Sequence, residues 1–223
     1  MLKQGLNSEK LIVQNMPEYV VVAPMGDNPD ALFVGIRQFP TKKIILLYQA
    51  AQKKDLDKLK QDLVRFQIPV EAYELKGDPI ESAFEFLANL KKIEGEERLL
   101  VNVSTGDRIT TCAVLSACYV KGVRAFGIMD NEPRLLPMLR FSYTKMISES
   151  KMKILRALME GSVNLESLAE KVKMSPPLVS YHFNGDRDSF GLIELGLVET
   201  VDQGREKIAQ LGAMGRLFAK GYL

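Results

Sequence analysis

The stretch VNVSTGDRITTCAVLSACYVKGV, residues 101–123, decides the fold class of the chain. An apolar, strand-like run beginning at residue 98 stops at the polar turn 104–108, and a helical pattern follows over 109–121. A strand that passes through a short turn into a helix is the building unit of α/β sheets. We therefore expect the turn to lie at the carboxyl end of a strand, where open α/β sheets bind ligands.

The same unit recurs throughout the N-terminal part of the chain. Short β-branched runs predict strands at 19–23, 43–48, 69–75, 98–103 and 123–128, and helical patterns lie between them at 30–39, 55–66, 80–93 and 109–121. The strands are almost continuously apolar, which indicates a parallel, doubly wound sheet covered by helices on both faces. A last apolar run, 135–143, contains Pro137 and suits an edge strand or an exit segment.

The pattern changes beyond about residue 148, where strands give way to short helices. Three are predicted, at 151–159, at 165–172 with Asn164 as N-cap, and from Ser175 with Pro176 at the first position. The last two form a helix-turn-helix unit. Residues 196–211 read as two strands around a turn at 202–205, which would be a wing. The fold class is thus a Rossmann-like, mostly parallel α/β domain at 1–147, followed by a small winged helix-turn-helix domain at 148–223.

Composition limits the function. The chain has 223 residues, 30 basic against 28 acidic, for a net charge of +2, which excludes a strongly basic nucleic-acid coat and requires any nucleic-acid contact to be local. Cys112 and Cys118 are expected to be small buried thiols in a reducing compartment, and the single histidine, His182, a half-buried packing residue. No apolar run reaches about 18 residues and no signal-peptide pattern is present, so we expect a cytoplasmic protein with no membrane partner, metal site or cofactor.

The polar turn has the chemistry of an anion site. Small residues allow a phosphate to approach the backbone at a helix N-terminus, hydroxyls donate hydrogen bonds, and Arg108 supplies a charged fork. The loop after the first strand has similar chemistry, and if the two strands are neighbours both loops line one cleft. Alternatively the turns are only helix caps, and Asp107 would repel an anion. The candidate ligand-binding residues are Met25, Gly26, Asp27, Asn28, Asn102, Ser104, Thr105, Gly106, Asp107 and Arg108.

This turn resembles the motif of the CRISPR-associated Rossmann fold (CARF), close to Asn-x-Thr-Gly-Gly-Thr-Lys. Asn102, Ser104 and Gly106 match the motif, and Arg108 takes the place of its lysine, whereas Thr105 and Asp107 depart from it. The C-terminal part resembles the winged helices of MarR and ArsR regulators in PPLVSYHF (176–183), LIELGLVET (192–200) and QGREKIAQLGAMGR (203–216). Together the two parts resemble the archaeal CRISPR-associated transcriptional regulators.

The resemblance implies a homodimer that binds a cyclic oligoadenylate as effector across its two-fold axis and grips DNA through its winged helices. Val172, Leu178, Val179 and Phe183 are expected to pack the recognition helix against Leu165 and Leu168. The candidate DNA-binding residues are then Pro177, Ser180, Tyr181 and Asn184 in the major groove and Arg205, at the wing, in the minor groove.

Two features of the C-terminal part affect the DNA prediction. Residues 148–223 carry ten basic and ten acidic residues, which predicts few phosphate contacts. The insertion NGDRDS, 184–189, follows the recognition helix, and Asn184-Gly185 predicts an early end of that helix. We expect the linker 142–150 to transmit the ligand signal.

Three functions are compatible with these patterns. The first is a ligand-gated DNA-binding regulator of CRISPR-related genes. The alternative is a ring nuclease that cleaves cyclic oligoadenylate in the CARF cleft, where Ser104, Thr105 and Arg108 would only need to position the substrate. The third is a regulator that senses another nucleotide or a small anion. No arginine precedes His182 at the spacing of the Arg-x4–6-His motif of CARF-fused ribonucleases.

Overall fold

A computed structural model of the chain describes residues 18–138, 146–203 and 206–222. These residues form two compact units, 18–138 and 146–222. The boundary predicted near residue 147 falls beside the segment 139–145, which lies outside the described residues and includes residues 142–145 of the predicted linker. Each unit is therefore described by itself.

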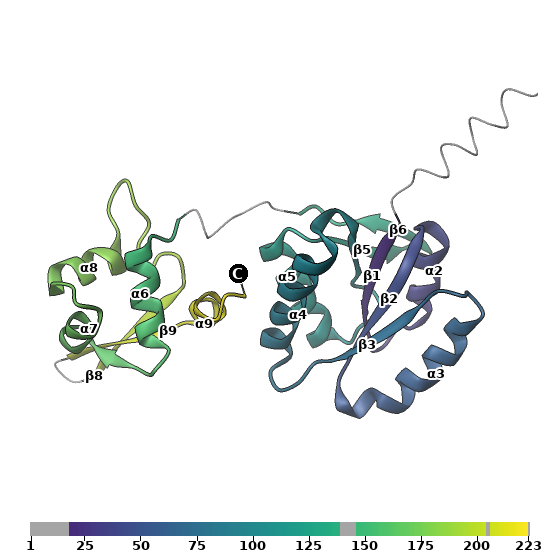
Figure 1. Ribbon diagram of the computed structural model, residues 1–223, viewed down its shortest axis with the longest axis horizontal. Coiled ribbons are helices and arrows are strands. Elements are labelled where there is room, and N and C mark those ends of the chain that lie inside the picture. Colours follow the sequence, from purple (N-terminus) through teal and green to yellow (C-terminus); the bar gives the residue numbers. More distant parts are fainter. Residues whose placement is uncertain (1–17, 139–145, 204–205, 223) are drawn as a thin grey trace, which may run out of the picture. The chain divides into compact units, whose positions relative to one another are not determined.

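The N-terminal unit is built on one six-stranded sheet in the order β3-β2-β1-β4-β5-β6 (Figure 1). The first five strands are parallel and β6 runs antiparallel beside β5. The chain moves outward from β1 to β3 and then returns to place β4 on the other side of β1. The topological switch point, where such sheets bind ligands, therefore lies between β1 and β4. The strands are β1 (Tyr19–Pro24), β2 (Thr41–Tyr48), β3 (Val70–Glu74), β4 (Leu99–Asn102), β5 (Arg124–Met129) and β6 (Glu132–Leu135).

Helices cover both faces of this sheet. Helices α2 (Asp30–Gln38) and α3 (Lys53–Val64) lie on one face, and α4 (Pro79–Glu94) and α5 (Arg108–Lys121) lie on the other (Figure 1). Short 3₁₀ turns, η1 (Ala50–Gln52) and η2 (Glu96–Arg98), precede α3 and β4. Burial on both faces explains the continuous apolar runs, because alternate side chains of each strand enter opposite halves of the core. The five parallel strands and four helices predicted from the sequence are confirmed, each boundary to within two residues.

The edge strand lies earlier than the sequence predicted. We expected it, if at all, within 135–143, but β6 ends at Leu135, and part of the predicted run lies outside the described residues. The reason is a tight turn at Asp130 and Asn131, whose φ angles of 53° and 60° are left-handed. Asp and Asn tolerate this conformation, which joins two antiparallel strands directly. Pro133 is acceptable in β6 because an edge strand has an unpaired side.

The C-terminal unit has the order of a winged helix. Its helices and a three-stranded sheet, β7-β9-β8, share a core that includes Ile154, Leu168 and Phe183. Asn164 caps α7 by accepting a 2.8 Å hydrogen bond from the Ser167 amide, as predicted. The wing hairpin of β8 and β9 is confirmed, whereas α9 was not predicted. The elements are α6 (Glu149–Leu158), β7 (Val163–Asn164), α7 (Leu165–Val172), α8 (Pro176–Asn184), β8 (Val198–Gln203), β9 (Glu206–Leu211) and α9 (Ala213–Ala219).

The two cysteines differ in their surroundings. Cys118 is buried, as predicted, and burial raises the pKa of its thiol far above the usual range. Cys112 is exposed, so its predicted burial was wrong. Six residues correspond to about 600° of helix rotation, which turns the two side chains to different faces. Within the described part of the chain, no helix is long and apolar enough to cross a membrane.

Candidate functional site

The loops that follow β1 and β4 pack against each other at the switch point. β1 and β4 are hydrogen-bonded neighbours, and the amide of Asn28 donates to the carbonyl of Thr105 over 3.3 Å. A Cβ on Gly26 would lie 1.9 Å from the amide nitrogen of Asp107, so only glycine allows the two backbones to approach this closely. The prediction that the two loops lie together is thus confirmed. They are in direct contact with each other, however, and do not enclose a cleft between them.

Asn102 joins the loop after β4 to helix α2. It is fully buried, its Nδ2 donates to the carbonyl of Ala31 over 3.0 Å, and its Oδ1 accepts from the amide of Ser104 over 3.0 Å. Both ends of the amide are therefore used inside the protein. In the structure Asn102 orients the turn and does not present its side chain at the surface.

The two hydroxyls of the turn also have partners in the protein. Ser104 Oγ accepts a 2.7 Å hydrogen bond from the amide of Ile128 in β5. Thr105 is 3% exposed, and its Oγ1 donates to the carbonyl of Asn102 over 3.4 Å. The Ser104 proton is still available to a ligand, but its oxygen is held against the sheet.

Asp107 is the N-cap of α5. Its Oδ1 accepts from the amide of Thr110 over 2.9 Å, and its Oδ2 accepts from the Thr110 hydroxyl over 2.7 Å. The carboxylate thereby places a negative charge at the helix N-terminus, where an anion would otherwise be favoured. Arg108, the first residue of α5, is exposed and is the cation of the turn that remains open to solvent.

A pocket of about 310 Å³ lies beside these loops, between α2 and α3. Its apolar wall includes Met25, Phe33 and Leu59, and its polar wall includes Gln52 and Thr105. The charged side chains around it are those of Asp30, Asp55, Lys58 and Asp62, three carboxylates against one amine. Of the predicted ligand residues, Met25, Gly26 and Thr105 line it, whereas Asp27 and Asn28 are exposed in the loop outside its lining.

Sequence reasoning missed the helical wall of this pocket. Asp55, Lys58 and Asp62 lie on α3 at spacings of three and four, which places them on one face of the helix. That spacing was visible in the sequence, but it is also usual on a solvent-exposed face. Gln52 is held at the pocket by a 3.0 Å hydrogen bond from its Nε2 to the carbonyl of Met25.

Helices α7 and α8 form the candidate DNA interface. The turn between them passes through Lys173, a left-handed residue with φ of 56°. Val179 and Phe183 of α8 are buried, as predicted, but Leu178 is 41% exposed, so the prediction that it packs inward was wrong. One helical residue before Val179, it is turned by about 100° away from the core.

The predicted major-groove residues lie on the outer side of α8. Pro177 and Asn184 are exposed, Tyr181 is 40% exposed, and Ser180 is half-buried. Asn184 Nδ2 donates to the carbonyl of Ser180 over 2.9 Å, which holds its side chain along the helix. Arg205 lies outside the described residues.

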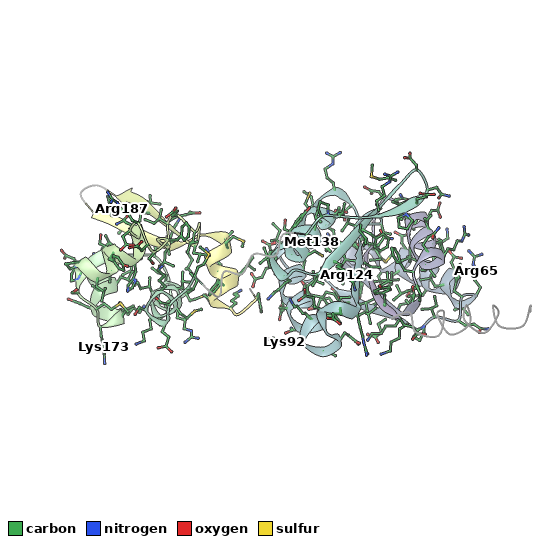
Figure 2. The ribbon with its side chains drawn as sticks, turned by 90° about the horizontal axis from the view of Figure 1, so that it is seen from above. Arg65, Lys92, Arg124, Met138, Lys173 and Arg187 are labelled. Carbon is green, nitrogen blue, oxygen red and sulfur yellow. The ribbon has the colours of Figure 1, made fainter. Side chains whose placement is uncertain are left out.

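The insertion after α8 forms a short, tied loop. α8 ends at Asn184, as predicted, and Gly185, with φ of 72°, bridges to Phe190. Lys151 of α6 is 3% exposed, and its Nζ donates to Ser189 Oγ over 3.0 Å and to the Phe190 carbonyl over 2.5 Å. Arg187 is exposed in this loop (Figure 2).

His182 lies beneath this loop, on the buried side of α8. It is 8% exposed, and its Nδ1 has no hydrogen-bond partner among the described residues. Burial, and secondly the positive charge of Lys151, hold the pKa of His182 below its usual value of 6.5. The histidine is more deeply buried than the sequence predicted. Its geometry is that of a neutral packing residue.

Comparisons with known proteins agree with the two-part architecture. Residues 19–132, just over half of the chain, match the family described as "HFX_2341_N:-like, N-terminal". Residues 148–200 match the HTH_5 family, described as bacterial regulatory protein, arsR family. No curated protein matches the chain. The resemblance inferred from the sequence is confirmed in its two parts, a Rossmann-like domain followed by an ArsR-type helix-turn-helix domain.

Several solved structures are similar to the chain, and three of them follow. Can2 from Sulfobacillus thermosulfidooxidans, in complex with cyclic tetra-adenylate, is 9% identical with a TM-score of 0.45, over 92% of this chain and 63% of that one. Protein VC1899 from Vibrio cholerae is 13% identical with a TM-score of 0.44, over 91% of this chain and 64% of that one. A type III CRISPR defence DNA nuclease activated by cyclic oligoadenylate is 17% identical with a TM-score of 0.45, over 70% of this chain and 27% of that one.

This chain spans less than two thirds of the length of each of the three solved structures. The family assignment rests on the sheet domain. The matched residues, 19–132, include the packed loops after β1 and β4, the Asn102 contacts and the adjoining pocket. The chain belongs to the HFX_2341_N-like family, and it carries an ArsR-type helix-turn-helix domain after the family's N-terminal domain.

Proposed function

We propose that this protein is a DNA-binding transcriptional regulator whose N-terminal domain senses a nucleotide. The observation that carries the proposal is the helix-turn-helix of α7 and α8 with its hairpin wing, in a domain that matches the ArsR regulators. The outer side of α8 is free of packing in its own domain and presents Pro177, Tyr181 and Asn184. A helix presented in this way is the element that enters the major groove in such domains.

The proposed effector is a cyclic oligoadenylate. Support comes from the resemblance of the 102–108 turn to the CARF motif and from its position at the switch point of the sheet. The charges indicate which part of a nucleotide would bind in the pocket and which part at Arg108. The pocket, with three carboxylates and one amine, repels phosphate and suits a base and ribose hydroxyls, whereas exposed Arg108 suits a phosphate.

We further propose that the protein acts as a homodimer and controls CRISPR-related genes. A cyclic ligand has internal symmetry, and a two-fold axis allows each subunit to present the same loops to it. The ligand can change DNA affinity only if it binds one arrangement of the two winged helices more tightly than another. A coupling of about 1–3 kcal/mol is typical of such regulation.

Calorimetry with cyclic tetra-adenylate tests the ligand site. Arg108→Ala should weaken binding by about ten- to a hundredfold, because a hydrogen bond to a charged group contributes about 1.5–3 kcal/mol. Arg37→Ala is the matched control, since Arg37 is exposed on α2 and does not line the pocket. Equal affinities of the two variants would show that Arg108 does not contact the ligand.

Fluorescence anisotropy tests the regulator. The DNA would be the region upstream of the protein's own operon, with random duplex as reference, in the presence and absence of cyclic tetra-adenylate. Tyr181→Ala should reduce the preference for the operon DNA. Met159→Ala, which removes a similarly exposed apolar side chain at the C-terminal end of α6, should not. Failure to prefer operon DNA in either ligand state would contradict the proposal.

The same samples test the alternative function of a ring nuclease. We propose that the ligand is bound and not cleaved, because the Ser104 oxygen and the Thr105 hydroxyl are both engaged by backbone groups. Chromatography after incubation should recover cyclic tetra-adenylate intact. Linear product that disappears in Arg108→Ala would instead support cleavage in this site.

A further inference from the structure

The charges of the C-terminal unit are segregated although their sum is zero. A hollow of about 420 Å³ lies between α6 and the turn that leads from α7 into α8. We call it the basic hollow. It is lined by Lys153, Arg156, Ala157, Lys171, Val172, Lys173 and Met174, which include four cations and no carboxylate. Four cations around one concave surface create a local positive field that the net charge conceals.

If helix α8 binds DNA, the cations that neutralise the phosphates have to lie on neighbouring elements. Its sequence, PPLVSYHFN over Pro176–Asn184, contains no lysine or arginine. Its single titratable base, His182, is buried and held neutral. The affinity of DNA-binding proteins depends strongly on cations that neutralise phosphates, so those cations have to come from other elements. Lys173 stands three residues before Pro176, and its side chain extends into solvent (Figure 2).

Little in the domain neutralises the basic hollow. Among the described residues, Lys171 forms an ion pair with Glu160, and its Nζ also lies 3.5 Å from the carbonyl of Ala157. Glu160 is largely exposed, at 70%, and Lys171 is 38% exposed, so a phosphate could replace Glu160 at small cost. A purely structural role, as cations that complement helix C-termini, would account for Arg156 and Lys171. It does not account for Lys153, which lies in the middle of α6.

We propose that the basic hollow binds the phosphate backbone of DNA beside the base pairs that α8 contacts. The inference rests on the proposed DNA-binding function and adds the surface that supplies most of its electrostatic affinity. It predicts a steeper salt dependence than the few phosphate contacts expected from the zero net charge of the domain would give. Phosphate contacts on this flank would set the position of α8 in the groove, while α8 itself reads the bases.

The test is the salt dependence of binding to fluorescein-labelled duplex DNA of random sequence, with the full-length protein. Each phosphate contact contributes about 0.9 to the slope of log affinity against log salt. Lys153→Gln with Arg156→Gln should therefore lower the slope by about 1.8 for each bound subunit. When the salt is raised from about 50 to about 200 mM, the native protein should then lose affinity by a factor about twelve times larger than the factor lost by the variant.

Two further variants make the result specific. Arg216→Gln with Lys220→Gln removes the same charge from another hollow of this domain, beside α9, and should leave the slope unchanged. Arg156→Lys changes the shape of the side chain but keeps its charge, so it should retain the native slope. A retained slope would show that the charge of residue 156, and not its packing, determines the salt dependence. If the native protein binds DNA but all slopes are equal, or if the α9 variant lowers the slope as much, the basic hollow is not the phosphate site. If the native protein binds no duplex DNA, both this inference and the proposed function are wrong.

Discussion

Replacing Asn102 tests whether the candidate site depends on an internal support or on a ligand contact. The resemblance to the CARF motif implies that Asn102 serves the ligand. In the structure its side chain is fully buried and joins Ala31 of α2 to Ser104 of the turn. Asn102→Ala should therefore destabilise the N-terminal domain, whether or not a nucleotide is present.

The size of the effect follows from the two hydrogen bonds that are lost. The carbonyl of Ala31 belongs to a residue that is 3% exposed, and the amide of Ser104 belongs to a half-buried one. Leaving a buried polar group unsatisfied costs about 1–3 kcal/mol. The Ala31 carbonyl lies within α2 and still accepts the helix's own hydrogen bond from the amide four residues on, so it loses only its second partner, whereas the Ser104 amide loses its acceptor and can partly turn to water. We expect the free energy of unfolding to fall by about 1–3 kcal/mol, a sizeable part of the roughly 5–15 kcal/mol usual for a domain.

Hydrogen exchange read by NMR on the full-length protein measures this loss within the N-terminal domain alone. The slowest-exchanging amides of β1 and β4 report global unfolding of that domain. The Ser104 amide reports the local contact, because it loses its acceptor. Asn28→Ala is the control, since that side chain is exposed and its backbone contact to Thr105 survives; it should change stability by less than about 0.5 kcal/mol.

Two outcomes would refute this reasoning. If Asn102→Ala matched Asn28→Ala in stability, the two hydrogen bonds would not support the turn. If in addition the affinity for cyclic tetra-adenylate were lost without a change in protection at Ser104, Asn102 would be a ligand contact.

Three more predictions follow from the contacts described above. His182 is the only histidine in the sequence, so an NMR titration of untagged protein should show one imidazole with a pKa below 6.5. Because this pKa is lowered on folding, the histidine's contribution to stability is complete above pH 6.5 and is lost as the pH falls through the folded-state pKa. A measured pKa of 6.5 or more would contradict the burial of the side chain. Lys151→Met should raise the pKa of His182 by removing a nearby positive charge, and should speed hydrogen exchange in the 185–191 loop; unchanged exchange would show that the lysine does not hold the loop. Gly26→Ala should separate the loops after β1 and β4 and abolish nucleotide binding, since its Cβ would lie 1.9 Å from the Asp107 amide nitrogen. The control is Gly77→Ala, where φ is +68° and no atom lies within 4 Å of the added Cβ, so that this substitution strains the backbone without a clash. Equal effects of the two variants on nucleotide binding would mean that the close approach of the loops is unimportant.

The sequence by itself determined the elements and their order. Near-continuous apolar strands alternating with helices indicated a parallel sheet, because these patterns depend on neighbours only a few residues away. The same is true of the Asn164 cap, the start of α8 at Pro176 and its end before Gly185. The order of the strands was not predicted: that the first and fourth strands are neighbours was only a condition of the proposed cleft, and the structure meets it by placing β1 beside β4.

Only the tertiary structure decided what the candidate residues do. Asn102 and Ser104 were predicted as ligand residues, but Asn102 donates to the Ala31 carbonyl of α2 and Ser104 accepts from the Ile128 amide of β5, contacts that depend on how these elements pack beside β4. Asp107, by contrast, caps α5 through an amide three residues away, which is the local alternative that the sequence left open. The pocket beside the turn and the basic hollow beside α8 combine residues from separate helices, whose alignment no local pattern encodes. Local periodicity fixes which face of a helix is buried, but the partner that a polar side chain finds is set by the three-dimensional packing of elements distant in sequence.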